Sequence, residues 1–265
     1  MARKTVHFKT LIAGAIVLHG LSGLTFAWLI FAYSPLSARA QSVSPDSSPL
    51  SRQLRFTPPD FSDVGRPARR TGGGSRGSCF IPDMSPLTAL VPDTNVGLTL
   101  AESPTFWFYV PYTLTSEHAI EFVLKDEQDN IVYTTKFPGK GTSPGIVSLR
   151  LPSTISLEAN KNYEWYFLIY CDAQNQERFV YVNGSVQRIE RPDLETQLAA
   201  ASPEEKIALY AIEGIWYEAL TYLAEQRHTS PQDSKINEDW TSLLQSVGLE
   251  SLASEPFVSC CSPEN

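Results

Sequence analysis

The feature that most constrains the fold is the segment TFWFYVP at 105–111, an unbroken run of aromatic and β-branched residues closed by a proline. Side chains alternate between the two faces of a strand, so Phe106 and Phe108 share one face while Trp107 and Tyr109 share the other. Both faces are therefore apolar, whereas an antiparallel strand with one wet face carries polar residues at alternate positions. We expect a further layer of the chain, or a partner, to cover this strand on each side.

The segment at 163–171 repeats this pattern. Tyr163 and Trp165 lie on one face with further apolar residues, and Tyr166 lies on the opposite face, which is also apolar. Tyr163 follows Leu157 by six residues in an approach rich in Pro, Ser and Glu, which is typical of the tyrosine corner of Greek-key sandwiches. At least two strands of the predicted sheet are therefore apolar on both faces and need covering layers.

Residues 81–190 are predicted to form an antiparallel, all-β sandwich of the immunoglobulin or fibronectin kind. Short β-branched or aromatic runs recur along this region with turn residues between them, which is the signature of a sandwich. We expect strands near 87–91, 96–101, 105–110, 119–125, 130–136, 145–151, 163–171 and 178–189.

Residues 191–265 are predicted to be helical, which makes the chain α+β with segregated regions. A capping box with proline at its first helical position begins at Ser202. The segment 214–231 resembles the second half of a tetratricopeptide repeat, with Ala219 and Leu223 at that motif's spacing. Because one such repeat cannot bury its own apolar face, we expect the helices to pack on the sandwich.

An aromatic seam between these layers is the site that the sequence predicts best. Interlayer packing is the ordinary use of large aromatic side chains, although such rings also stack on carbohydrate. The predicted seam consists of Phe106, Trp107, Phe108, Tyr109, Tyr163, Trp165, Tyr166 and Trp216.

The N-terminus, residues 1–40, is predicted to be a signal peptide. A basic start precedes an uncharged run at 11–33, and small residues before Gln41 favour cleavage after Ala40. Because the uncharged run is long enough to cross a bilayer, an uncleaved signal anchor is the alternative. Either reading places the rest of the chain outside the cytoplasm, in the periplasm or cell envelope.

Residues 41–80 are predicted to be a disordered basic arm, since they are rich in Ser, Pro and Gly and have no apolar period. The glycine-rich stretch at 69–78 lacks the Gly-Lys-Ser/Thr ending of a phosphate-binding loop. It is therefore interpreted as a solvated hinge, or as a segment that binds an anionic polymer.

The four cysteines are Cys79, Cys171, Cys260 and Cys261. In an oxidising compartment an even number favours disulfides, and four cysteines allow three pairings. We take Cys79–Cys171 as the candidate disulfide, because it would join the end of the arm to the end of a long strand. No C-x-x-C motif is present, so we expect no metal site.

The net charge and the absence of two catalytic motifs narrow the classes of function that the chain can have. The net charge of −8 argues against nucleic acid as a partner. Neither G-x-S-x-G nor H-E-x-x-H occurs, and the two histidines beyond the leader, His118 and His228, sit in a loop and at a helix end. We therefore assign no catalytic residue and expect no cofactor. If the protein is an enzyme, carboxylates are its only plausible catalysts.

Six blocks of the sequence resemble a family of exported cyanobacterial proteins known only as domain-of-unknown-function family 928. The blocks are RRTGGGSRGSC, TALVP, PTFWFYVPY, PGIVSL, YEWYF and GIWYEAL, in that order. The resemblance covers residues 65–261 and implies a cyanobacterial source and an envelope location. It implies no activity, so no site residue is carried over from it.

These observations favour a non-enzymatic binding or scaffolding protein of the cell envelope, whose partner is a protein or an envelope polymer. Contact with a membrane is expected only if the N-terminal segment is uncleaved. The alternative is a carboxylate-dependent enzyme that acts on cell-wall or extracellular polysaccharide.

Overall fold

The computed structural model of the protein describes residues 54–61, 68–74 and 85–260. The chain divides into two units, Met1–Ser48 and Pro49–Asn265. The first unit lies wholly outside the described residues, and with it the predicted signal peptide and its cleavage after Ala40. Everything below concerns the second unit.

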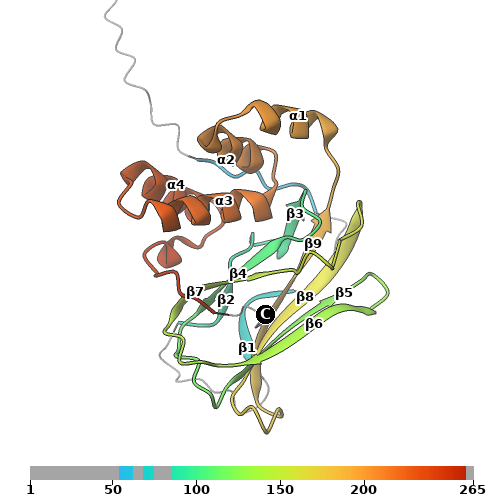
Figure 1. Ribbon diagram of the computed structural model, residues 1–265, viewed down its shortest axis with the longest axis vertical. Coiled ribbons are helices and arrows are strands. Elements are labelled where there is room, and N and C mark those ends of the chain that lie inside the picture. Colours follow the sequence, from blue (N-terminus) through green and yellow to red (C-terminus); the bar gives the residue numbers. More distant parts are fainter. Residues whose placement is uncertain (1–53, 62–67, 75–84, 261–265) are drawn as a thin grey trace, which may run out of the picture. The chain divides into compact units, whose positions relative to one another are not determined.

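In the described residues, nine strands form one continuous sheet (Figure 1). Their order is β6-β5-β8-β9-β1-β2-β4-β7, with every neighbouring pair antiparallel, and β3 pairs in parallel with β9. The strands are β1 (Arg69–Gly74), β2 (Thr88–Ala89), β3 (Val96–Thr99), β4 (Thr105–Val110), β5 (Ala119–Lys125), β6 (Ile131–Pro138), β7 (Gly145–Arg150), β8 (Lys161–Tyr170) and β9 (Phe179–Arg188).

The sheet is strongly curled, so that its two halves face each other across the core. Phe108 of β4 stacks on Phe167 of β8 with ring centroids 4.0 Å apart. Phe106 lies 4.9 Å from Phe122 of β5. The α+β class is confirmed. However, the strands form a half-barrel and not the two separate sheets of the predicted sandwich, because β1 and β2 connect one half to the other.

The predicted tyrosine corner has the expected contact. The Tyr163 hydroxyl accepts a hydrogen bond from the backbone N–H of Glu158, five residues upstream, at 2.9 Å. Tyr163 itself is buried. This contact fixes the approach to β8 without requiring an immunoglobulin topology.

Part of the segment predicted as a disordered arm belongs to the fold. β1 lies between β9 and β2, and Leu54 and Phe56 are buried, with Phe56 edge-on to Trp216 at 4.9 Å. The prediction of disorder was wrong for β1. This strand pairs with its neighbours through backbone groups and has no apolar face that would reveal it in the sequence. A Cβ atom at Gly72 would lie 3.0 Å from Val180 and 3.1 Å from Leu87, so this close approach favours glycine.

The helices follow the strands, as predicted. They are α1 (Pro192–Ala200), α2 (Pro203–Ile212), α3 (Trp216–Thr229) and α4 (Ser234–Gln245), followed by a 3-10 turn (Glu250–Leu252). The capping box is confirmed, because the Ser202 side chain accepts from the Glu205 N–H and the Glu205 carboxylate accepts from the Ser202 N–H. Their tetratricopeptide-like character stays a prediction.

The first turn of α3 is inserted into the curled sheet. Trp216 donates its indole N–H to the carbonyl of Leu90 at 2.9 Å. The Tyr217 ring lies 5.3 Å from that of Phe106, and its hydroxyl accepts from Trp165 Nε1 at 2.9 Å. Tyr217 therefore closes one end of the core between the two halves of the sheet.

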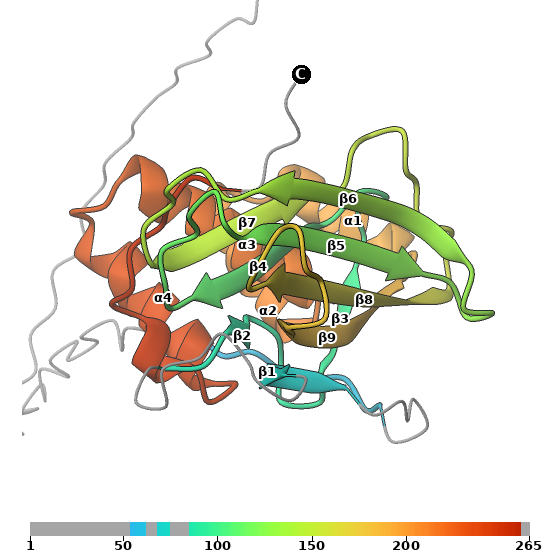
Figure 2. The ribbon, with the colours of Figure 1, turned by 90° about the horizontal axis from the view of Figure 1, so that it is seen from below.

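The helical layer covers only one of the two doubly apolar strands. On the outer face of β4, Trp107 donates its indole N–H to Thr221 of α3 at 3.0 Å. On the outer face of β8, Tyr166 lies 6.3 Å from Tyr181 of β9 instead. In Figure 2 the helices lie behind the strands, and none crosses in front of β5, β6 or β8. No described helix therefore covers β8, and of the two covers that the sequence predicts, a layer of the chain or a partner, the helices supply the first for β4.

The place of β1 in the sheet can be tested at Gly72. Replacing Gly72 with Val should lower the free energy of unfolding by about 1–3 kcal/mol, because the added methyl groups overlap Val180 and Leu87. The control Thr71→Val changes an exposed side chain of the same strand and should stay within about 0.5 kcal/mol of wild type. Equal urea midpoints for both variants would show that this segment is not packed in the sheet.

Candidate functional site

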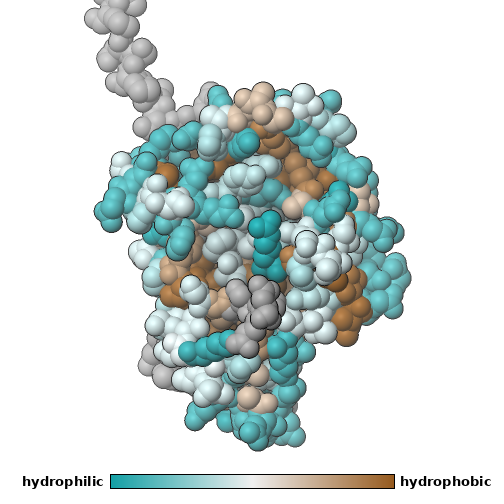
Figure 3. Space-filling model, viewed as in Figure 1, coloured by the Kyte–Doolittle hydropathy of each residue, from teal (hydrophilic) through white to brown (hydrophobic). Residues whose placement is uncertain are grey.

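Two adjoining pockets lie between α3 and the outer face of β4 and β7. Their volumes are about 430 Å³ and about 600 Å³, and both are lined by Thr105, Arg150 and Glu225. We call them together the α3 groove. The space-filling view shows hydrophobic side chains in separate patches with hydrophilic ones between them (Figure 3), so the surface of this face is chemically mixed.

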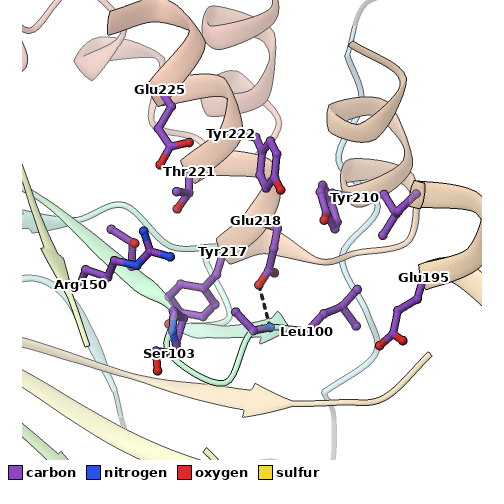
Figure 4. Close-up of a pocket in the computed structure, with 14 residues that line it drawn as sticks. Leu100, Ser103, Arg150, Glu195, Tyr210, Tyr217, Glu218, Thr221, Tyr222 and Glu225 are labelled. Carbon is purple, nitrogen blue, oxygen red and sulfur yellow. Dashed lines mark hydrogen bonds between the residues drawn. The ribbon is translucent and has the colours of Figure 1, made fainter. Parts of the chain in front are cut away.

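The smaller pocket contains tyrosines and carboxylates (Figure 4). Tyr210 of α2 and Tyr222 of α3 face each other with ring centroids 5.4 Å apart. Tyr222 is 37% exposed, so its ring is open to a ligand. Glu195 enters from α1 and Glu225 from α3. Three helices therefore contribute to the wall of this pocket opposite the sheet.

Glu218 is the buried carboxyl of this pocket. Its Oε1 accepts hydrogen bonds from Thr99 Oγ1 at 2.5 Å and from the backbone N–H of Ala101 at 3.0 Å. Its Oε2 is buried and has no hydrogen-bond partner among the described residues. Burial raises the pKa of Glu218, although both hydrogen bonds act in the opposite direction. The side chain thus fastens α3 to the end of β3 and retains a proton to a higher pH than an exposed glutamate.

The larger pocket has aromatic side chains of its own, Trp107 and Phe257. Phe257 lies edge-on to Trp107 at 5.7 Å and to Trp240 at 5.3 Å. The C-terminal segment is held against β7, because the Ile146 N–H donates to the carbonyl of Pro256 and the Val258 N–H donates to that of Ile146. His228, the last-turn histidine of α3, also lines this pocket.

Arg150 lies where the two pockets meet. It is the last residue of β7 and its side chain is exposed. Within the described part of the chain, no carboxylate lies within ion-pair distance of its guanidinium. Figure 4 draws the guanidinium on the side of Tyr217 and Thr221. Five N–H donors are therefore available to a ligand in the groove.

The structure separates the residues of the predicted seam. Phe106, Phe108, Tyr163 and Trp165 lie between the two halves of the sheet, and Trp216 is buried at the start of α3. Trp107 and Tyr109 face outward from β4, where Trp107 lines the groove and Tyr109 hydrogen-bonds Glu255. Tyr166 lies away from both sets, on the outer face of β8.

The remaining predicted residues do not assemble a site. His118 contacts Thr115 Oγ1 through Nδ1 at 3.0 Å, as befits a turn residue. Cys79 and Cys261 lie outside the described residues, so the Cys79–Cys171 pairing stays a prediction. Neither Cys171 nor Cys260 is a free thiol.

Glu218 and Arg150 were missed by the sequence analysis. Glu218 had a signal, because it is a single charged residue among the apolar residues of GIWYEAL. A charge is rarely buried without a purpose. Arg150 had no such signal in the sequence, because an arginine at the end of a strand is common.

In the part of the chain that the structure describes, no cluster of three or more His, Cys, Asp or Glu side chains could hold a metal ion. A search of the same residues for helices with the length and apolarity of a membrane span finds none.

The family model described as a domain of unknown function, DUF928, matches residues 71–257. No curated protein matches the chain.

The buried state of Glu218 predicts a pH dependence of stability. Above pH 4.5, the ordinary pKa of a glutamate, the unfolded chain loses a proton that folded Glu218 retains. The free energy of unfolding of the wild type should therefore fall relative to that of Glu218→Gln as pH rises, by at most about 1.4 kcal/mol per pH unit.

Urea unfolding at several values between pH 4 and pH 8 measures this difference. The control Glu225→Gln changes an exposed side chain of the same helix and should follow the wild type throughout. Parallel curves for Glu218→Gln and the wild type would contradict the buried, protonated carboxyl.

Proposed function

We propose that this chain, which belongs to the DUF928 family, is a polysaccharide-binding protein of the cell envelope, and that the α3 groove holds a segment of the polymer. The observation that carries the proposal is the pair of adjoining pockets that share Thr105, Arg150 and Glu225. An elongated groove with two sub-sites suits a chain of repeating units better than a single small molecule.

The chemistry of the groove supports a sugar ligand. Aromatic rings offer apolar faces to the C–H groups of a sugar ring, and Tyr222 and Trp107 provide one such ring in each pocket. Thr105 and Ser148 contribute hydroxyls, and Arg150 contributes donors that no described carboxylate occupies. A few polar groups placed among aromatic walls are the usual composition of a ligand site.

An envelope location is part of this proposal. The basic start, the uncharged run at 11–33 and the small residues before Gln41 support export. The absence of free thiols at Cys171 and Cys260 is compatible with an oxidising compartment. The groove would then face polymers of the envelope.

A carboxylate-dependent enzyme acting on polysaccharide is the second candidate, because Glu218, with its raised pKa, shares a pocket with Glu195 and Glu225. A protonated carboxyl beside a second carboxylate is the arrangement that glycoside cleavage uses. The enzymatic function is the weaker candidate of the two, because Oε2 of Glu218 is buried and a substrate cannot reach it in this conformation. Release of reducing ends by the wild type but not by Glu218→Gln would establish it.

The groove can be tested with neutral polysaccharides. Dextran and glucomannan, titrated into the full chain and followed by calorimetry, should reveal binding to at least one polymer. Tyr222→Ala should weaken that binding at least tenfold, or about 1.4 kcal/mol, because the stacking ring is lost.

The control for this experiment is Ile212→Ala, which removes a more exposed apolar side chain, at 51%, from the end of α2 outside the groove. It should bind like the wild type. Equal affinity of Tyr222→Ala and wild type, or no binding to either polymer, would contradict the proposed groove.

A further inference from the structure

The C-terminal segment of the described chain, residues 255–260, forms one wall of the larger pocket of the α3 groove. Phe257, Val258, Ser259 and Cys260 line this pocket together with residues of β4, β7 and α3. In Figure 1 this segment, drawn in dark red, descends from the helices to the sheet beside β7. We call residues 255–260 the C-terminal strap.

The strap occupies the edge of β7 that β4 does not use. β7 is the end strand of the sheet and pairs along its whole length with β4. At its other edge, the Ile146 N–H donates to the carbonyl of Pro256 at 2.7 Å, and the Val258 N–H donates to that of Ile146 at 2.9 Å. One further contact, from Thr142 Oγ1 to the carbonyl of Ser259, is 3.5 Å long. The backbone attachment of the strap is therefore a single parallel bridge, and it is the weaker of the two attachments of β7.

Phe257 of the strap occupies aromatic surface that the proposed function assigns to the polymer. Its ring lies edge-on to Trp107 at 5.7 Å and to Trp240 at 5.3 Å, and the guanidinium of Arg227 lies 5.1 Å from its centroid. Trp107 is the ring that we propose to stack on a sugar in the larger pocket. While the strap is closed, Phe257 therefore competes with the polymer for Trp107.

The strap passes so close to β7 that only a glycine fits at Gly145. A Cβ atom at this position would lie 2.5 Å from the carbonyl oxygen of Pro256 and 2.9 Å from Cγ1 of Val258. Gly145 does not itself line either pocket of the groove. A side chain at Gly145 would therefore displace the strap without changing a side chain that is proposed to bind the polymer.

We propose that the C-terminal strap regulates the α3 groove, and that the polymer binds fully only when the strap withdraws from β7. The inference rests on the proposed function, because it concerns the same groove. Withdrawal would free the ring of Trp107 and extend the groove along the edge of β7, where the backbone groups of Ile146 would become available to sugar hydroxyls. If only a fraction of the molecules is open, the apparent affinity for the polymer is lower than the intrinsic affinity by that fraction.

The opening of the strap can be measured without a ligand. The full chain is kept oxidised, because Cys260 is not a free thiol. The amides of Ile146 and Val258 are released when the strap leaves, whereas the amide of Val147 points towards β4, because backbone groups alternate along a strand. In hydrogen exchange followed by NMR, the two strap-bound amides should exchange faster than that of Val147 by about tenfold or more.

Two variants open the groove by independent means. Gly145→Ala should displace the strap, and Phe257→Ala should remove the competing ring. Both should raise the affinity for dextran or glucomannan, whichever the wild type binds, by about threefold or more. The gain for Gly145→Ala should not exceed the factor by which the closed strap slows exchange of the Val258 amide, because both quantities report the open fraction. A strap with only a structural role predicts weaker binding, because either variant would loosen a wall of the pocket.

The matched control is Gly141→Ala, in the loop between β6 and β7. The φ angle is positive at both glycines, but a Cβ atom at Gly141 would meet nothing within 4 Å. This variant should keep the wild-type affinity and the wild-type exchange of the strap-bound amides.

The strap and the groove can fail separately. Exchange of the strap-bound amides as slow as that of Val147, or unchanged or weaker polymer binding by both Gly145→Ala and Phe257→Ala, would overturn the strap and leave the groove intact. No binding of dextran or glucomannan by the wild type or by any variant would contradict the groove itself, and the strap would fail with it as a regulator.

Discussion

A buried hydrogen bond between Trp165 and Tyr217 joins the sheet to the helical region, and the rest of the structure depends on it. Trp165 is a core residue of β8, and Tyr217 belongs to the first turn of α3. Leaving either polar group unpaired in the core would cost about 1–3 kcal/mol. The start of α3 is therefore fixed inside the curled sheet. The helix then runs along β4, where Trp107 meets Thr221, and the α3 groove is the space that this arrangement leaves.

Much of the fold follows from local patterns. Runs of aromatic and β-branched residues identified β4, β5 and β8, and the capping box at Ser202 identified the start of α2. β1 escaped detection because Gly72 contributes close backbone packing and no apolar side chain. The choice between a sandwich and a half-barrel was also beyond the sequence, because it depends on the pairing of β1 with β2 and not on the strands that carry the strong signal.

The functional surfaces were less accessible to prediction. The sequence shows that β4 and β8 are apolar on both faces and need covering layers. It does not show which outer face the helices cover. Trp107 and Tyr166 look equivalent in the sequence, yet the first meets α3 and the second faces away from the helices. The groove joins Ala101, Arg150 and Glu218, which are far apart in the chain, and only tertiary packing brings such residues together.

The central claim is that α3 and the curled sheet form one cooperative unit. Native-state hydrogen exchange followed by mass spectrometry tests it directly, because it measures the opening free energy of each segment. Amides of α3 and of β8 should exchange with the same free energy, close to that of global unfolding. Exchange of α3 at a much lower free energy than β8 would show that the helix opens independently and would contradict the account.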